Sequence, residues 1–329
     1  MISLHQLVED SGLQSLVMGA SKDPNAKITV LLVSPESRRA VLAVKLPTTD
    51  AAARAVAAEQ RVLEMLWQRA DGVEATVPRV VGEVEFRGRP CLVTTAVDGL
   101  PMSTAYLRRG HTARAGRVQA DFASVERWLA RLHGATAGAP AALDMGSGVA
   151  LRLASRFDGD ARLREDLDRL AEIHASLAQS TAPRTAVHGD LWCGNVLLTG
   201  ARASGVVDWE AGAADGEPVR DLVRFAHMYA LFLDRRTRRG RRVRGHAGLR
   251  AGAFGAGVEH ALGGSGWFPD LFRRFLQDGL ARLGVAPERW RDAALAGIAE
   301  VAAMTDEDGF ARLHLALFRR AAQPRGGLL

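Results

Sequence analysis

The stretch AVHGDLWCGNVLLTGARASGVVDWE, residues 186–210, decides how the rest of the sequence is interpreted. His188, Asp190 and Asn195 stand in the spacing H-x-D-x-x-x-x-N, and Asp208 follows thirteen residues after Asn195. Apolar runs on either side of a turn over 200–205 predict a β-hairpin. This hairpin would bring Asp208 back beside Asn195.

These residue types suit phosphoryl transfer from a nucleotide. That reaction needs a carboxylate that orients the acceptor hydroxyl and takes its proton, and oxygen ligands for the magnesium that neutralises the phosphates. Asp190 fits the first role, and Asn195 and Asp208 fit the second, because Mg²⁺ prefers oxygen ligands. The alternative is that Asp190 and Asp208 are ordinary turn residues. The joint spacing makes a chance arrangement a poor explanation.

The residues before this stretch predict a small domain rich in strands. Apolar, β-branched runs predict strands at 28–33, 40–46, 80–84 and 90–97, with the first two joined as an antiparallel hairpin. Val56, Leu63 and Leu66 recur at helical spacing and predict a helix over 50–68, with Asp50 as its N-cap. We place a first domain at 1–97, with a linker at about 95–100.

Helical periodicity dominates the second predicted domain, 98–329. The helices are expected at 121–133, 160–179, 218–233, 269–283, 287–304 and 306–321. Only short strands, near 186, 196–198 and 205–207, interrupt them. The expected fold class is therefore α+β, with a small antiparallel β lobe followed by a larger, mostly helical lobe.

The motif spacing resembles the catalytic and metal-binding motifs of the protein-kinase-like fold. It is more similar to the aminoglycoside phosphotransferase family, in which H-G-D and D-W-E-type sequences occupy these places, and HGDLWCGN is also similar to the loop of fructosamine kinases. The resemblance covers most of residues 15–235, and its specific motifs lie within 188–221. It implies a bilobal protein-kinase-like fold that binds ATP, or GTP, together with Mg²⁺.

The resemblance also implies a lysine that binds the nucleotide phosphates and a helix glutamate that pairs with it. Lys45 interrupts an apolar strand, where a charged side chain needs a partner or ligand. Glu59 shares the inward stripe of Val56 and Leu63, whereas Glu64 phases with the polar face, so we choose Glu59 as the partner. Within the catalytic loop, His188 is expected to hold the loop backbone rather than to transfer a proton.

Two further regions are expected to contact the nucleotide, and one aspartate is expected to brace the catalytic loop. Thr95 to Val97 would bond the adenine through the backbone, because the family uses its interlobe linker in this way. The sequence has no G-x-G-x-x-G before its first strands, and the region around Gly19 and Ser21 offers a shorter turn that could cover the phosphates. A plain polar hairpin loop fits that region equally well. Asp221 resembles a family aspartate that braces the catalytic loop, although a helix N-terminal carboxylate would look the same.

Composition and cysteine usage place the chain in an ordinary globular class. It has 329 residues, of which 47% are hydrophobic and 24% charged, which excludes a disordered or collagen-like protein. Its two cysteines, Cys91 and Cys193, cannot form a disulfide framework and favour a reducing compartment. No apolar run reaches the roughly 18 residues of a membrane span, so we expect a cytoplasmic protein without a membrane partner.

Charge bears on the remaining partner, the hydroxyl acceptor. Residues 211–329 hold 13 acidic residues against 19 arginines, which disfavours a polycationic aminoglycoside and suits a sugar, ketosamine or related natural product at least as well. Seven arginines lie in Arg235–Arg244, whereas the net charge of the whole chain is +6. We interpret this run as a solvated loop, and nucleic acid as an unlikely partner. The alternatives left open are a ketosamine kinase, and a module of the same fold that binds nucleotide or a partner without turnover.

Overall fold

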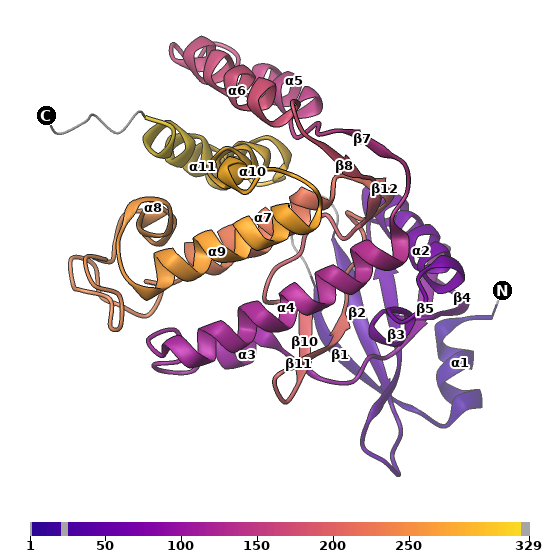
Figure 1. The fold of residues 1–329 in the computed structure, drawn as a ribbon. Coiled ribbons are helices and arrows are strands. Elements are labelled where there is room, and N and C mark those ends of the chain that lie inside the picture. The colour runs from indigo at the N-terminus through magenta and orange to yellow at the C-terminus, as the bar shows by residue number, and fades with distance from the viewer. Residues whose placement is uncertain (1, 21–25, 324–329) are drawn as a thin grey trace, which may run out of the picture. The chain divides into compact units, whose positions relative to one another are not determined.

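The computed structural model describes residues 2–20 and 26–323 and forms two compact units. The first contains Met1–Thr104, Arg127–Ala137 and Ala186–Gly216, and the second contains Ala105–Glu126, Gly138–Thr185 and Glu217–Leu329. The segment that carries the H-x-D-x-x-x-x-N motif therefore belongs to the same unit as the N-terminal strands (Figure 1).

The first unit is built on a five-stranded antiparallel sheet with the order β1-β2-β3-β5-β4. Its strands are β1 (Gln14–Ala20), β2 (Lys27–Val33), β3 (Ala40–Pro47), β4 (Val80–Phe86) and β5 (Arg89–Thr95). Four of them lie where the apolar runs predicted strands, and β2 and β3 form the expected hairpin. Strand β1 was not predicted, because it is an edge strand whose apolar residues, Leu16 to Met18, are exposed and follow no alternating pattern.

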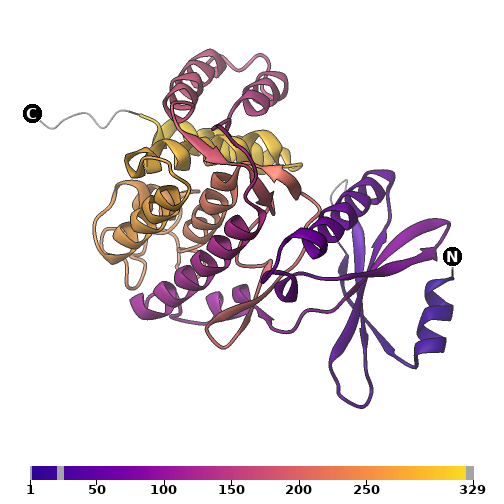
Figure 2. The ribbon, with the colours of Figure 1, turned by 45° about the vertical axis from the view of Figure 1, so that its right-hand side comes forward.

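Side-chain alternation gives the two faces of this sheet different tasks. Val30, Leu32, Val44 and Leu46 point to one face and form a buried core on which the apolar residues of α1 (Leu4–Ser11) pack. The opposite face carries Lys45 and faces α2 (Asp50–Arg69), as the separation of α1 and α2 by the sheet in Figure 2 shows. Because successive side chains of a strand point to opposite faces, Val44 is buried in the core and its neighbour Lys45 lies on the face toward α2.

Helix α2 confirms the predicted helix but corrects its cap. Thr49 is the N-cap, and its hydroxyl accepts a hydrogen bond from the Ala52 amide at 3.1 Å. Asp50 lies in the first turn and pairs with Arg89 of β5 instead. Both arrangements place an oxygen near the positive end of the helix dipole, which is why the sequence signal did not separate them.

The remaining elements of the first unit surround the motif segment. They are η1 (Glu74–Thr76), β6 (Leu100–Pro101), β10 (Val196–Thr199), β11 (Arg202–Val206) and β12 (Ala213–Gly216). Strands β10 and β11 pair as an antiparallel hairpin, with Val196 opposite Val206, and β6 pairs with the other edge of β10. Along the chain, α3 (Met102–Tyr106), α4 (Ala115–Thr136) and β9 (Thr185–Val187) pass from one unit to the other.

The second unit is mainly helical and is organised around α10 (Trp290–Met304). This alanine-rich helix is almost wholly buried among α5 (Ser147–Arg156), α6 (Leu163–Leu177), α7 (Pro218–Leu231), α9 (Trp267–Arg282) and α11 (Asp308–Ala321). The other elements are α8 (Ala256–Gly263), η2 (Pro287–Arg289), β7 (Pro140–Ala142) and β8 (Thr181–Pro183). The structure confirms an α+β fold with an N-terminal antiparallel sheet and a larger helical part. Among the described residues, no helix combines the length and apolarity that crossing a membrane requires.

Candidate active site

A cavity of about 890 Å³ lies in the first unit, over the Lys45 face of the sheet. Its walls come from the sheet (Thr29, Leu31, Ala43, Lys45, Thr94), from Glu59 of α2, from Thr95–Pro101, and from the hairpin residues Asn195, Leu197, Val207 and Asp208. Six of the eight residues proposed from sequence therefore line one cavity: Lys45, Glu59, Thr95, Val97, Asn195 and Asp208. Ser21 lies outside the described residues.

Lys45 is the hub of the charged groups in this cavity. Its Nζ lies 2.6 Å from both carboxylate oxygens of Glu59 and 2.7 Å from Oδ1 of Asp208. Glu59 is almost fully buried at 1% exposure, and its Oε1 also accepts from the backbone amide of Trp209 at 3.2 Å. Glu64, the rejected alternative, pairs with Gln60 on the exposed face of α2. One glutamate thus links β3, α2 and the residue that follows Asp208.

Lys27, which the sequence argument did not select, joins the same cluster. It begins β2 and donates to Oδ1 of Asp208 at 2.7 Å and to the carboxylate of Glu210. Strand pairing places residue 29 opposite Lys45, and so brings the start of β2 close to Lys45. The scarcity of lysine, with only three in the chain, was the one sequence signal that could have pointed to Lys27. The structure shows that two of the three meet at one aspartate.

The electrostatics of the cluster favour its charged forms. Burial alone would raise the pKa of the Asp208 carboxyl, but the positive charges of Lys45 and Lys27 outweigh burial and hold that pKa well below its usual range. Burial alone would lower the pKa of Lys45, whereas Glu59 and Asp208 raise it above its usual value. Burial and the charge of Asp208 raise the pKa of Glu210. Both Lys45 and Asp208 are therefore ionised at neutral pH.

The loop that carries Asp190 is held by His188 and Gly189. Nδ1 of the buried His188 accepts from the Asp190 amide at 3.2 Å, so the neutral ring carries its proton on Nε2 and donates it to the carbonyl of Val207 at 2.9 Å. Gly189 has φ +78°, and a Cβ there would lie 2.1 Å from the carbonyl oxygen of Ala211. These contacts fix the backbone of Asp190 against the strand that leads to Asp208.

Asn195 and Asp208 are adjacent across the hairpin. The Val207 amide donates to the Asn195 carbonyl at 3.0 Å, and Nδ2 of Asn195 donates to the Asp190 carbonyl at 3.0 Å. The Asn195 amide oxygen is thereby the atom of that side chain that could bind a metal ion. Both lysines donate to Oδ1 of Asp208, and in the described part of the chain no hydrogen bond reaches Oδ2. The two remaining oxygens fit a magnesium ion, which takes few protein ligands and completes its shell with phosphate and water.

Asp208 itself has an unusual backbone. Its φ of +73° lies in the left-handed region that few residues other than glycine adopt. Two sets of hydrogen bonds stabilise this strained conformation. Both lysines donate to the Asp208 carboxylate, and the backbone amides of the flanking Val207 and Trp209 are also bonded. The turn aims the side chain of Asp208 into the cavity.

The remaining residues that the sequence analysis singled out lie in the 95–97 segment, in α7 and at the two cysteines. The amides of Thr95 and Ala96 donate to the carbonyls of Arg79 and Val41, so Val97 offers the amide of this segment that a base could use. Asp221 is fully buried in the first turn of α7, within the second unit. Cys91 and Cys193 are buried, and neither forms a disulfide.

The comparisons with known proteins give the family and the fold of this chain. The sequence pattern described as the phosphotransferase enzyme family matches residues 28–257, and the chain belongs to this family. No curated protein sequence gave a match.

Solved structures share the fold over almost the whole chain. A thermostable mutant of the aminoglycoside phosphotransferase APH(4)-Ia, in a ternary complex with ADP and hygromycin B, is 12% identical with a TM-score of 0.59, and the alignment covers 98% of each chain. Macrolide 2′-phosphotransferase MphH from Brachybacterium faecium is 17% identical with a TM-score of 0.52, over 97% of each chain. The streptomycin–ATP–APH(2″)-IIa complex is 15% identical with a TM-score of 0.53, also over 97% of each chain.

Proposed function

We propose that this protein is a small-molecule kinase that transfers the terminal phosphoryl group of ATP, or GTP, to a hydroxyl group. The observation that carries the proposal is the convergence of Lys45, Glu59, Asn195 and Asp208 on one cavity, next to the loop that holds Asp190. Family membership supports the same reaction class. Positioning and charge stabilisation account for most of the catalysis of phosphoryl transfer, and this cluster supplies both.

Each side chain has a defined task in the proposed reaction. Lys45 and Lys27 bind phosphate oxygens, and Glu59 holds the Lys45 ammonium in place. Asn195 and Asp208 would hold magnesium, which when bound supplies positive charge to the bridging phosphate oxygens. Val97 offers its backbone amide to the base.

Asp190 acts on the acceptor. It orients the hydroxyl and accepts its proton while the oxygen of that hydroxyl forms a bond to the terminal phosphorus. The bond from this phosphorus to the bridging oxygen breaks, and the nucleoside diphosphate leaves with the electron pair. The products are a phosphate monoester and ADP, or GDP.

The acceptor is proposed as a class of small hydroxyl compound. The structural relatives include phosphotransferases in complexes with hygromycin B and streptomycin, and a macrolide 2′-phosphotransferase, which makes hydroxyl-rich natural products the first compounds to test. The HGDLWCGN loop adds ketosamines to that panel. The surplus of arginine over acidic residues after residue 210 favours neutral or anionic acceptors over polycationic ones.

The test is nucleotide consumption by the wild type and by Asp190→Asn, with Mg²⁺ and ATP or GTP, across aminoglycosides, macrolides, ketosamines and sugars. We expect acceptor-dependent turnover that falls by about a thousandfold or more in Asp190→Asn, with nucleotide affinity within about twofold. Asp71→Asn, an exposed change in the same unit, is the matched control and should keep wild-type turnover. Wild-type turnover in Asp190→Asn would remove Asp190 from the mechanism, and failure to bind Mg²⁺-nucleotide would overturn the proposal.

A further inference from the structure

The second unit contains a pocket of about 230 Å³ whose character differs from that of the candidate active site. It lies where segment 106–113 meets the end of α7 and the chain that follows, 232–244. Five arginines line it: Arg108, Arg109, Arg235, Arg236 and Arg244. We propose that this pocket binds a small anion through a phosphate or carboxylate group. The inference is independent of the proposed kinase activity.

The five arginines have no internal counter-charge. Among the described residues, none of them forms an ion pair with a carboxylate, and no Asp or Glu lines the pocket. Elsewhere in the same unit arginines are neutralised, as by the Arg220–Glu300 pair at 2.8 Å and the Arg319–Asp166 pair at 2.6 Å. Like charges gathered without partners repel one another, so an anion that binds among them relieves this repulsion.

Nearby carboxylates are already committed to other donors. Asp234, next in the chain to Arg235, accepts from the Gly252 amide at 3.0 Å. Asp121 accepts from the Tyr229 hydroxyl and from His111, both at 2.7 Å. Neither of these carboxylates forms an ion pair with one of the five arginines among the described residues.

The two walls of the pocket are fixed to the unit. The Tyr106 hydroxyl donates to the Tyr229 carbonyl at 2.9 Å, and Nε2 of His246 bonds to the Thr112 carbonyl at 2.8 Å. Gly245 approaches so closely that a Cβ there would lie 2.5 Å from the Ala113 carbonyl oxygen. Arg235 is further held over the Phe232 ring, 5.6 Å from its centroid. The arginines therefore project from a braced framework.

The lining also suits the uncharged part of a small molecule. Tyr106, Leu107, Phe232, Leu233 and Val243 contribute apolar surface, and Thr112 and Thr237 contribute hydroxyl groups. A guanidinium binds phosphate or carboxylate through paired N–H groups, and several guanidinium groups around one hollow can share one anion. This combination describes an organic phosphate or carboxylate better than an extended polyanion.

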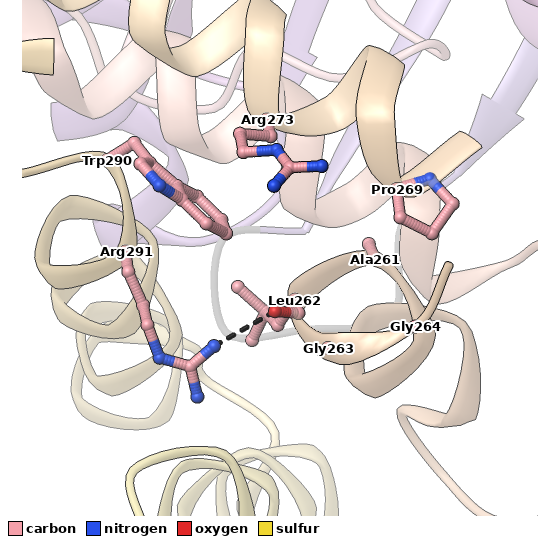
Figure 3. A pocket seen from close by; sticks show the side chains of 8 residues that line it. All are labelled: Ala261, Leu262, Gly263, Gly264, Pro269, Arg273, Trp290 and Arg291. Atoms are coloured by element: carbon pink, nitrogen blue, oxygen red, sulfur yellow. Dashed lines mark hydrogen bonds between the residues drawn. The ribbon is translucent and has the colours of Figure 1, made fainter. Parts of the chain in front are cut away.

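Another arginine-bearing pocket of the same unit shows the contrast (Figure 3). It has a volume of about 200 Å³ and lies between the end of α8 and the starts of α9 and α10. There the Arg291 guanidinium donates to the carbonyls of Leu262 and Ala321, both at 2.9 Å, and Arg273 pairs with Asp270 at 2.5 Å. Those two arginines bond to groups of the protein itself, whereas the five arginines of the 230 Å³ pocket are available to a ligand.

The experiment is a calorimetric titration of the full chain with inorganic phosphate and, separately, with citrate, at low ionic strength because salt screens exposed charges. The pocket variant is Arg109→Gln with Arg236→Gln. The matched control is Arg238→Gln with Arg241→Gln, which removes the same amount of charge from arginines of the 235–244 run that do not line the pocket. Circular dichroism and the unfolding temperature verify that both variants keep the fold.

We expect the pocket variant to weaken binding of at least one anion by about tenfold or more, and the control to stay within about twofold. The two probes identify whether phosphate or carboxylate is preferred. Equal weakening in both variants would assign the binding to diffuse charge of the run and overturn the proposal. An affinity unchanged in the pocket variant would place the anion elsewhere, for example at Lys27 and Lys45, and overturn it too.

Discussion

Lys27 and Lys45 both donate to Oδ1 of Asp208, so one carboxylate oxygen accepts from two ammonium groups. A lysine at this position can exchange a carboxylate for a phosphate oxygen, because both are hard anionic acceptors. Lys27 also bonds to Glu210, which gives its ammonium a second anchor. At the scale of the residue, the proposed phosphate site therefore consists of two lysines from neighbouring strands.

The role of Lys27 is tested by Lys27→Met and by the conservative change Lys27→Arg. We expect Lys27→Met to raise the KM for nucleotide by about tenfold or more, because a positive charge facing the phosphates is lost. Lys27→Arg should recover part of that loss. Arg61→Met, on the exposed face of α2, is the control and should leave KM unchanged. A KM in Lys27→Met equal to that of the wild type would exclude Lys27 from nucleotide binding.

At the level of single residues, the sequence predicts those candidate site residues that belong to a short motif or to a clear helical pattern. The motif spacing identified Asp190, Asn195 and Asp208 as candidate site residues. Glu59 could be distinguished from Glu64 because it falls on the inward face of its predicted helix. Lys27 escaped because a polar residue at the start of an apolar run looks like an ordinary strand flank. Its importance arises from the pairing of β2 with β3, a non-local contact that no short motif encodes.

At the scale of the element, the turn that carries H-G-D depends on Gly189. Its left-handed φ and its approach to the Ala211 carbonyl leave no room for a Cβ. We expect Gly189→Ala to abolish most turnover and to lower the free energy of unfolding by about 1–3 kcal/mol.

Gly200, in the turn of the β10–β11 hairpin, provides the matched control for this change. It also has a positive φ, +63°, but a Cβ there would meet nothing within 4 Å. Gly200→Ala therefore carries the conformational cost without the clash and should keep turnover. Urea unfolding and steady-state rates compare the two variants. Equal effects of the two changes would show that the backbone approach at residue 211 is unimportant.

Helices with a clear hydrophobic periodicity were predicted from the sequence. Short helices that depend on packing against the rest of their unit were missed. The helices α7, α10 and α11 fall close to their predicted ranges, and α4 starts six residues earlier, at Ala115. Helices α5 and α8 are short, with Gly146 or Gly255 as N-cap and no side-chain cap, so their local signal is weak. Burial against the rest of the second unit, rather than propensity, stabilises such helices.

At the scale of the whole molecule, buried histidines couple stability to pH. Nδ1 of His314 donates to the Phe310 carbonyl at 2.9 Å, so its Nε2 accepts from Nε2 of His227 at 3.0 Å. This bond requires a neutral His314, and the buried Nδ1 of His227 has no hydrogen-bond partner among the described residues that would favour its protonation. Burial lowers the pKa of His314 to about 4 and that of His227 well below its usual value.

An unfolded histidine titrates near 6.5, so between about pH 6.5 and 4 the unfolded chain binds more protons than the folded one. The free energy of unfolding should therefore fall as the pH drops through this window, by up to about 1.4 kcal/mol per pH unit for each histidine. Urea unfolding at pH 7 and pH 5 measures the slope. His227→Leu with His314→Leu should flatten it, whereas His5→Gln, at an exposed site, should not. An unchanged slope in the double variant would assign the pH dependence to other groups.

The scarcity of lysine in this chain has a practical corollary. Of its three lysines, two end at Asp208, and the chain otherwise uses arginine as its cation. Reagents that acylate primary amines therefore have few side-chain targets, and the buried, ionised Lys45 should react slowly at neutral pH. Mass spectrometry could follow whether a bound nucleotide changes the reactivity of Lys27 and Lys45. Amine coupling likewise offers few attachment points on a sensor surface, and two of the three lysines line the cavity whose ligand the sensor is meant to record.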